Sequence, residues 1–435
     1  MLLKINYKIL SIILIIISFS SLLVGFYFEE NSAGAGSYTG DITIIWNNLQ
    51  IFLTNDIISS IHHQDYYSSR TPLVYIFHTI FNPFTENIVS YRSSVFAISL
   101  SVPFLFYFSL RQKFSDKDNL LLLLISSLVC LSPYYRTSGF WGLEENFGLI
   151  FLLLTFLSLN SFQKNDISSD RNLHLKLIAT TFLSSCCLYF DQKLIIIPLI
   201  CFITILRSEK SLKIKLFCVF YYLIFSLPYI YLILLWGGLI PTALLDPVYG
   251  RKLGSDIFLI HIGYASSMIA FYLLPLILFK DKNLLELIKN VLSKKINYFL
   301  IFLFVIYIIY LAIFFNFNQQ PFIGKGIIHK ISQLVFDDSL LQLIFVYISF
   351  FASWIIILIY IENKLTDILT ILFLLILSLF LYPIFQEYFD PLILLMAFTF
   401  FNTKLKINYK NSIILYIYLS LLLIGSNFYY ENLLN

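Results

Sequence analysis

The chain has 435 residues, of which 59% are hydrophobic and only 12% are charged, and its net charge is +4. Soluble domains are about 45–50% apolar and about 25% charged, and the apolar residues of this chain lie in long blocks. The composition excludes an ordinary soluble enzyme, a disordered chain and a nucleic-acid-binding domain, and it indicates a multi-pass membrane protein. All five cysteines lie inside apolar blocks, so neither a disulfide framework nor a CxxC metal site is expected.

Apolar blocks long enough to cross a bilayer begin near the N-terminus, and we expect an all-α fold with about 13 transmembrane helices (roughly 11–13). The expected spans are 9–28, 88–110, 120–135, 143–162, 175–190, 194–206, 216–236, 257–279, 298–315, 340–361, 368–385, 391–402 and 412–428. Three of them, 120–135, 175–190 and 194–206, are short and are candidates for tilted or re-entrant segments. The first block is longer than a signal peptide and leads into aromatic residues and Glu29, so we interpret it as an uncleaved span.

Lysine and arginine are unevenly distributed between the expected loops. With the N-terminus in the cytoplasm, the inner segments hold 21 of the 29 basic residues, whereas 16 of the 25 acidic residues lie outside. Because cytoplasmic loops are enriched in lysine and arginine, this distribution predicts a cytoplasmic N-terminus and an extracytoplasmic C-terminus. In a bacterium, the chain would lie in the inner membrane.

The centres of the expected spans carry almost no ionisable residues. The charges that touch a span lie at its outer end, at Arg92, Glu144, Glu145, Asp191, Lys193, Glu387 and Asp390. Charged groups inside a membrane are costly and usually mark function. An ion-coupled carrier would need acidic residues or histidines near the midplane, often beside paired broken helices, and the sequence shows no such pairing. We therefore expect the polar chemistry at the extracytoplasmic surface of the membrane.

The first extracytoplasmic loop, residues 29–87, is far longer than a simple connection, and loops of that length are usually functional. Apolar residues follow Asp41 at helical spacing, namely Ile44, Ile45, Leu49, Phe52 and Leu53. This pattern predicts an interfacial amphipathic helix with Asp41 at its N-cap. A second amphipathic helix is expected over 72–81, with Pro72 at its first position.

Other outer segments carry charged residues within short connections between spans. They are SPYYRTSGFWGLEENFG at 132–148 with Arg136, Glu144 and Glu145, an elbow with Asp191 and Lys193, the turn 237–256 with Arg251 and Lys252, and 316–339 with Lys325 and Lys330. An acidic residue soon after the first span (YTGDITIIWNNLQ), an Arg-Thr-Pro stretch (SSRTPLVYIFHTIF), the 132–148 turn and the elbow FDQKLIIIPL together resemble the GT-C superfamily of glycosyltransferases. The resemblance is closest to protein O-mannosyltransferases and to aminoarabinose or lipopolysaccharide core transferases.

This resemblance implies a single GT-C-like transmembrane domain, with a catalytic module over roughly 1–206 and a variable helical remainder over 207–435. It implies an enzyme that moves a sugar from a polyprenyl-phosphate donor to a lipid, glycan or protein acceptor. Many relatives carry an Asp-Glu or Asp-Asp pair in the first loop, whereas this chain has Asp41-Ile42. That difference argues against a metal-dependent variant, and neither a metal nor a cofactor is expected.

The reaction needs a base for the acceptor hydroxyl and cations for the leaving phosphate. Asp41 is the candidate base. The candidate phosphate and sugar contacts are Arg70, Arg136, Lys193 and Arg251, and the candidate acceptor contacts are Glu144 and Glu145. Arginine binds phosphate through two donors and lysine acts as a point charge. Lys193 is favoured because its elbow runs against the positive-inside trend.

Each candidate also has a purely structural interpretation. Asp41 could serve only as a helix cap, and Glu144 and Glu145 could favour a helix N-terminus through the helix dipole. Arg136 could extend to lipid headgroups. The cluster of His62, His63 and Asp65 is better explained as a hydrated loop than as a metal site, because no third spaced histidine follows. For the function of the whole chain, the alternatives are a lipid-linked glycan transporter or flippase, a glycan polymerase or ligase, and a non-catalytic assembly factor.

Overall fold

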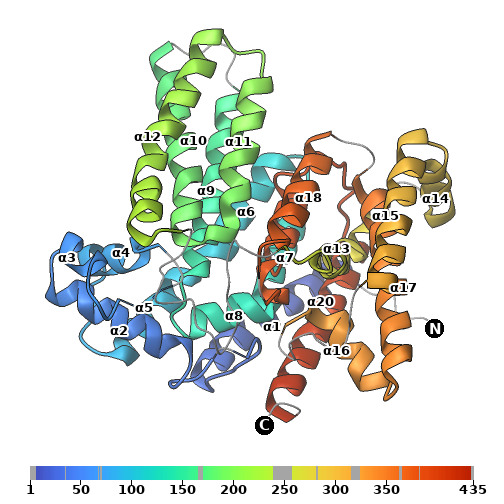
Figure 1. Cartoon of the computed structure of the whole chain (residues 1–435), viewed down its shortest axis with the longest axis horizontal. Helices are drawn as coiled ribbons and strands as arrows, with labels where there is room; N and C mark the ends of the chain where they lie inside the picture. The colour runs from blue at the N-terminus through green and yellow to red at the C-terminus, as the bar shows by residue number, and fades with distance from the viewer. Residues whose placement is uncertain are drawn as a thin grey trace. The chain divides into compact units, whose positions relative to one another are not determined.

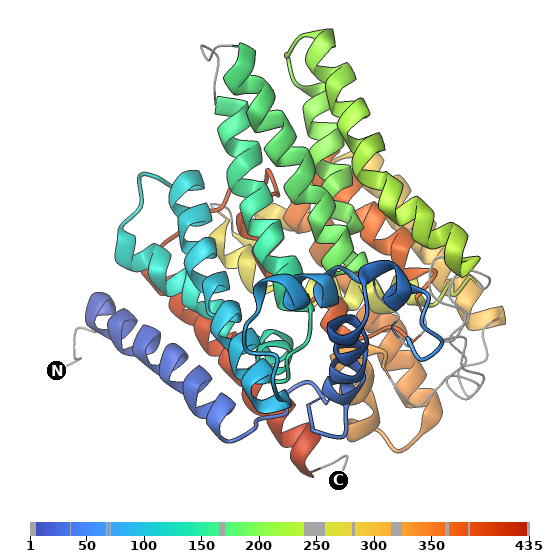
Figure 2. The same ribbon diagram turned by 90° about the vertical axis from the view of Figure 1, so that its left-hand side faces the viewer.

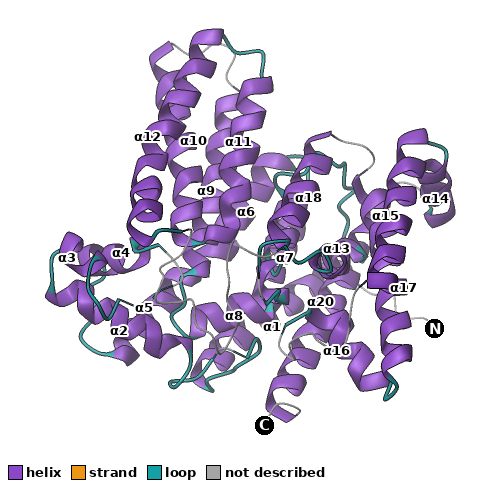
Figure 3. Cartoon of the chain, in the orientation of Figure 1, coloured by secondary structure: helices purple, strands orange, loops and turns teal. Residues whose placement is uncertain are grey.

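Most of the chain is described by the computed structural model, and the described residues are helical without any strand (Figure 3). They are residues 6–34, 36–66, 68, 71–164, 170–238, 257–280, 283–314, 324–361, 365–381 and 383–432. The chain forms two compact units, unit 1 (Met1–Leu245 with Tyr416–Asn435) and unit 2 (Asp246–Leu415). The division falls near residues 245 and 415.

Among the described residues, eight helices are long and apolar enough to cross a membrane, so the chain is a multi-pass membrane protein. They are α1 (Tyr7–Tyr27), α5 with α6 (Ile88–Ser99 and Ser101–Lys113), α9 (Glu145–Lys164), α10 (Asp170–Phe190), α12 (Leu212–Trp236), α15 (Lys295–Phe314), α17 (Ser339–Ile361) and α20 (Tyr409–Asn432) (Figure 1). A ninth candidate is bent by 68° and consists of α7 (Asn119–Ser127), η1 (Leu128–Leu131) and α8 (Pro133–Phe140).

The expected count of thirteen spans is not confirmed. Four expected spans, 194–206, 257–279, 368–385 and 391–402, fall on α11 (Ile196–Arg207), α13 (His261–Leu273), α18 (Leu365–Ser378) and α19 (Leu392–Phe398), which have 12, 13, 14 and 7 residues. At 1.5 Å per residue, such helices extend over roughly 10–21 Å and do not cross a hydrocarbon core of about 30 Å. The block 175–190, which looks short in the sequence, belongs to α10 with its full 21 residues.

Three short helices lie between α1 and α5, namely α2 (Asp41–Thr54), α3 (Ile57–Ile61) and α4 (Leu73–Phe81). Helices thus occupy both predicted amphipathic stretches. The N-cap of α2 is Gly40, so Asp41 is the first helical residue and not the cap. The apolar face of α2 packs against α4, and in Figure 2 this blue layer lies across one end of the green helices α9 to α12.

The core of unit 1 is formed by α9, which packs against α6 and α10, while α10 also packs against α11 and α12. Every residue from 124 to 149 is buried, including the charged side chains in that segment. The bend before α8 follows from its sequence. Ser132 caps the helix by accepting the N–H of Tyr135, and Pro133 stands where a backbone N–H is not needed.

Helix α12 contains Pro228, and a side chain from α10 enters its hydrogen-bond ladder. The hydroxyl of Tyr189 accepts the N–H of Tyr229 at 3.0 Å and donates to the carbonyl of Phe225 at 2.7 Å. These two backbone groups would normally bond to each other, so the hydroxyl takes the place of one helical hydrogen bond. The Thr71 hydroxyl donates to the carbonyl of Tyr189, which ties the first loop to the same point.

Unit 2 is built around α13, which packs against α17, α18 and α19. Its other elements are η4 (Pro275–Phe279), α14 (Leu284–Leu292), α15, α16 (Gly326–Val335) and η6 (Gln386–Tyr388). The start of α16 carries a buried basic group, Lys325. Burial lowers the pKa of Lys325 to about 8, and the Nζ of Lys325 lies 3.4 Å from the Nε2 of His329.

Candidate functional site

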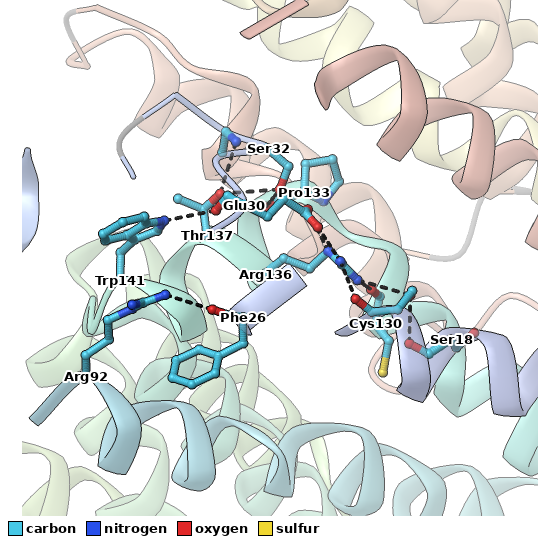
Figure 4. Close-up of polar contacts among 12 residues, drawn as sticks. Ser18, Phe26, Glu30, Ser32, Arg92, Cys130, Pro133, Arg136, Thr137 and Trp141 are labelled. Atoms are coloured by element: carbon cyan, nitrogen blue, oxygen red, sulfur yellow. Dashed lines mark hydrogen bonds and ion pairs between the residues drawn. The ribbon is translucent and has the colours of Figure 1, made fainter. Parts of the chain in front are cut away.

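Two buried arginines hold the turn that follows α1. Arg136 of α8 donates from Nε to Oε1 of Glu30 at 2.8 Å and from Nη2 to Oε2 (Figure 4). Its remaining N–H groups reach the Ser21 hydroxyl at 3.3 Å, the Ser21 carbonyl at 2.8 Å and the Cys130 carbonyl at 3.1 Å. All five donors of Arg136 therefore end on protein acceptors, and the residue is only 2% exposed. In this arrangement Arg136 positions the turn and offers no donor to a phosphate.

Arg92 of α5 holds the neighbouring carboxylate. It donates from Nη1 to Oε1 of Glu29 at 3.0 Å and from Nη2 to the carbonyl of Phe26 at 2.9 Å. Its guanidinium lies 4.6 Å from the ring centroids of both Phe26 and Trp141, and the Trp141 indole donates to the carbonyl of Glu30 at 2.9 Å. We call Arg92, Arg136, Glu29 and Glu30 the arginine clamp. It joins the end of α1 to α5 and α8.

Gly25 of α1 lies directly against the arginine clamp. A Cβ atom at Gly25 would lie 2.4 Å from Nη2 of Arg136 and 2.4 Å from Oε2 of Glu30. Real Cβ atoms do not approach so closely, and the two atoms belong to a buried ion pair that cannot move aside easily. Only glycine therefore leaves room for the pair at this point of α1.

Asp41 lies at the start of α2 and is exposed. The chain is anchored on both sides of it. Before it, the Tyr38 ring lies 5.3 Å from the Trp141 ring, and after it, the Trp46 ring lies 5.8 Å from the Tyr91 ring. The Tyr91 hydroxyl in turn donates to the carbonyl of Gly142 at 2.9 Å. Asp41 is thus held between two contacts that both lead to the turn after α8.

Glu145 is the first residue of α9 and is 3% exposed. The Tyr134 hydroxyl donates to its Oε1, and the Ser138 hydroxyl donates to its Oε2 at 3.0 Å. Tyr134 and Ser138 are four residues apart on α8 and therefore share one face of that helix. Two neutral donors from α8 thereby fix the plane of the carboxylate.

Lys193 lies in η2 (Gln192–Ile195), the elbow between α10 and α11. Its Nζ is 3.4 Å from Oδ2 of Asp191 and 5.1 Å from the centre of the Tyr134 ring. The elbow approaches α9 closely, because a Cβ at Gly148 would lie 3.1 Å from the Cβ of Asp191. We call Tyr134, Ser138, Glu145, Asp191 and Lys193 the Tyr134 cluster.

Glu144 is also buried, at 3% exposure. Burial raises the pKa of Tyr66 well above its usual value, and the charges of Tyr75 and Glu144 raise it further. Tyr75 donates to the Ser68 hydroxyl at 3.2 Å, and Asn48 of α2 donates to Tyr75 at 3.4 Å. These hydroxyl groups connect α2, α4 and the segment between α3 and α4, and the charge of Glu144 acts on Tyr66 in that segment.

Further candidate residues are named by the sequence. Arg70 and Arg251 lie outside the described residues. His62 contacts the hydroxyl of Tyr231 at 3.0 Å, and His63 lies 3.8 Å from Asp65. Where the structure describes the chain, no group of three or more histidine, cysteine, aspartate or glutamate residues could hold a metal ion.

Two groups of residues at this site are not evident from the sequence. Glu29 and Glu30 directly follow the first span, but their arginine partners are 63 and 106 residues away in the sequence. Tyr134 looks like an ordinary interfacial aromatic residue. In the sequence, only the four-residue spacing between Tyr134 and Ser138 indicates that both side chains reach the same partner, Glu145.

Five of the seven candidate residues lie in the described part of unit 1, at or around the buried segment 132–148. Glu145 and Lys193 share one partner, Tyr134, and the helix that begins at Asp41 is anchored to the same segment. Arg136 belongs to the arginine clamp beside them. In comparisons with known proteins, no protein-family profile, no curated protein and no solved structure matches this chain.

Proposed function

We propose that this chain is a membrane glycosyltransferase that moves a sugar from a polyprenyl-phosphate donor to a lipid, glycan or protein acceptor. The reaction would take place on the extracytoplasmic side of a bacterial inner membrane, with the N-terminus in the cytoplasm. The observation that carries the proposal is the meeting of a carboxylate and an ammonium group on Tyr134, in the buried segment to which the helix that begins at Asp41 is anchored. A buried acid and a largely shielded cation at one end of a set of apolar helices suit a lipid substrate with a charged head.

In this proposal Asp41 is the general base. It takes the proton of the acceptor hydroxyl, the hydroxyl oxygen forms a bond to the anomeric carbon of the sugar, and the bond from that carbon to the phosphate oxygen breaks. The leaving group is a polyprenyl phosphate that carries an additional negative charge. The exposure of Asp41 supports this role, because the base has to reach an acceptor that arrives from outside.

Cations near the leaving phosphate stabilise the charge that develops on it. Lys193 is the described cation that suits this role, and Arg70 and Arg251 remain candidates from the sequence. We assign Arg136 to positioning, because its five donors already bind protein acceptors. Glu144 and Glu145 are proposed to hold the acceptor, and the two hydroxyls on Glu145 support a fixed orientation for such a contact.

The test uses Asp41→Asn with Asp65→Asn as the matched control, since Asp65 is an exposed acid of the same loop. Purified protein is incubated with lipid-linked sugars extracted from host membranes, and the release of free polyprenyl phosphate is measured. Asp41→Asn should lower the rate at least about 100-fold, the usual contribution of general base catalysis. The control should release polyprenyl phosphate at the rate of the wild type. An Asp41→Asn protein with full activity would remove the base assignment.

A further inference from the structure

Tyr134 makes two different contacts with two charged residues. Its hydroxyl donates to Oε1 of Glu145, and its ring face lies 5.1 Å from the ammonium of Lys193. The side chain is 5% exposed, so both contacts are shielded from water and are stronger than they would be at a surface. A tyrosine has only two rotatable side-chain bonds, and the ring therefore fixes the hydroxyl and the ring face relative to each other.

The partners of Tyr134 come from different helices. Glu145 begins α9, whereas Lys193 lies in the elbow after α10. Asp191 accepts the backbone N–H of Lys193 at 3.1 Å and also lies near its Nζ, so the elbow presents the lysine in one direction. Tyr134 contacts both side chains, and it therefore couples the position of the Glu145 carboxylate to the position of the Lys193 ammonium.

We infer that Tyr134 is a positioning residue that sets the acceptor-binding carboxylate of Glu145 against the phosphate-binding ammonium of Lys193. This inference rests on the proposed function and deepens it. The hydroxyl acts on the acceptor side of the reaction, because it orients Glu145. The ring acts on the donor side, because it holds Lys193 by a cation–π contact.

Three variants separate these two actions. Tyr134→Phe removes the hydroxyl and keeps the ring, whereas Tyr134→Leu removes both. Ser138→Ala removes the serine hydroxyl that donates to Glu145 and keeps the contact between Tyr134 and Lys193. Tyr135→Phe is the matched control, because Tyr135 is the neighbouring buried tyrosine of α8 and its hydroxyl donates to the carbonyl of Ser99 at 2.8 Å.

The first measurement is steady-state transfer with donor and acceptor extracts from host membranes. Tyr134→Phe and Ser138→Ala should each lower kcat about 10-fold with an unchanged KM for the donor, since a hydrogen bond to a charged group contributes about that factor. Tyr134→Leu should also raise the donor KM by about 3- to 10-fold. Tyr135→Phe should leave both constants at the wild-type values.

The second measurement does not require transfer. Purified protein is titrated with farnesyl phosphate, a short isoprenyl phosphate, and with farnesol as the phosphate-free control. Wild type and Tyr134→Phe should bind farnesyl phosphate equally and in preference to farnesol, whereas Tyr134→Leu and Lys193→Ala should bind it about 3- to 10-fold more weakly.

The outcomes distinguish the inference from the proposed function. A wild-type protein that transfers sugar, with Tyr134→Leu unchanged in kcat, donor KM and farnesyl phosphate binding, would overturn the inference and leave the proposed function intact. Equal losses in Tyr134→Phe, Tyr134→Leu and Tyr135→Phe would reduce Tyr134 to a general packing role and would also overturn it. A wild-type protein that never releases polyprenyl phosphate would instead contradict the proposed function.

Discussion

The arginine clamp and the Tyr134 cluster both use residues of the short helix α8, and both bury charged side chains, yet they are built differently. In the clamp, each carboxylate faces an arginine, and every N–H of Arg136 is used by the protein. In the cluster, the Glu145 carboxylate accepts hydrogen bonds from two hydroxyls, and the Lys193 ammonium lies 3.4 Å from Asp191 and over the Tyr134 ring. Buried charge alone therefore does not mark a binding site. The two regions differ in that Arg136 holds its partner through a two-pronged ion pair, whereas hydroxyls and a ring help to hold the charges of the cluster.

This difference predicts separate consequences for the two regions. Changes in the clamp should lower the amount of folded protein, because they leave a buried charge without its counterion. Changes in the cluster should lower activity while the protein remains folded.

Arg136→Ala should lower the free energy of unfolding by about 3 kcal/mol, the lower end for a broken buried ion pair, because it leaves the partly buried carboxylate of Glu30 without its arginine. Arg136→Lys should be intermediate, since lysine keeps the charge and loses the two-pronged contact. Thermal unfolding of the detergent-purified proteins measures both effects. If Arg136→Ala were as stable as the wild type and had lost only transfer activity, Arg136 would be a substrate contact. The structural role assigned to the arginine clamp would then be wrong.

Gly25→Ala should destabilise the protein by about 1–3 kcal/mol, the usual cost of forcing extra atoms into a packed core. The added methyl group would meet Nη2 of Arg136 and Oε2 of Glu30 at 2.4 Å. Gly425→Ala is the control, since a Cβ there has nothing within 4 Å among the described residues. The melting temperature should fall for Gly25→Ala, and it should stay level or rise slightly for Gly425→Ala, because alanine favours the interior of α20 more than glycine does. Equal melting temperatures in the two variants would show that the clamp tolerates displacement.

His78 represents a third kind of buried polar group, one packed among aromatic rings. Its ring lies 4.9 Å from Tyr91 and 5.1 Å from Phe147, and burial lowers the pKa of His78 from 6.5 to about 3. The unfolded chain binds a proton below about pH 6.5, and the folded chain does so only near pH 3, so stability falls as the pH drops through this window. At pH 5 the loss from His78 is roughly 2 kcal/mol.

His78→Gln should remove that part of the acid sensitivity while keeping a polar group beside Asn82, whose side chain lies 2.9 Å from Nδ1 of His78. The measurement is the difference between the melting temperatures at pH 7.5 and pH 5.0, in wild type and variant. The wild type should lose more on acidification. Identical losses would mean that His78 does not titrate with unfolding.

Hydropathy predicts the positions of the eight long helices because apolar residues in blocks of about 20 have few alternatives in a membrane protein. It does not reveal where a helix stops inside an apolar block. The segment 257–279 reads as one span, but α13 ends at Leu273 and a 3₁₀ helix begins at Pro275. Proline cannot continue the α-helical ladder, and the remaining apolar residues mask that break in the average.

For the candidate site, the sequence predicts that Glu144, Glu145 and Lys193 lie at span ends, because charges are excluded from the span centres. Their convergence depends on tertiary contacts, such as the one between Tyr134 and an elbow 59 residues later. The sequence predicts Arg136 as a phosphate contact because a lone arginine on an acidic face has no visible partner. The structure supplies that partner, Glu30, in the turn directly after α1.

We propose that unit 1 transfers sugar from a polyprenyl phosphate at the buried segment 132–148. The composition of the host's lipid pool tests this proposal most directly. Cells whose only copy carries Asp41→Asn are compared with wild-type cells and with Asp65→Asn cells by mass spectrometry of extracted lipids. We expect one polyprenyl-phosphate sugar to accumulate in the Asp41→Asn cells alone, because the transfer reaction that consumes this lipid has stopped. The same lipid pool in all three strains, with the Asp41→Asn protein present at the normal level, would contradict it.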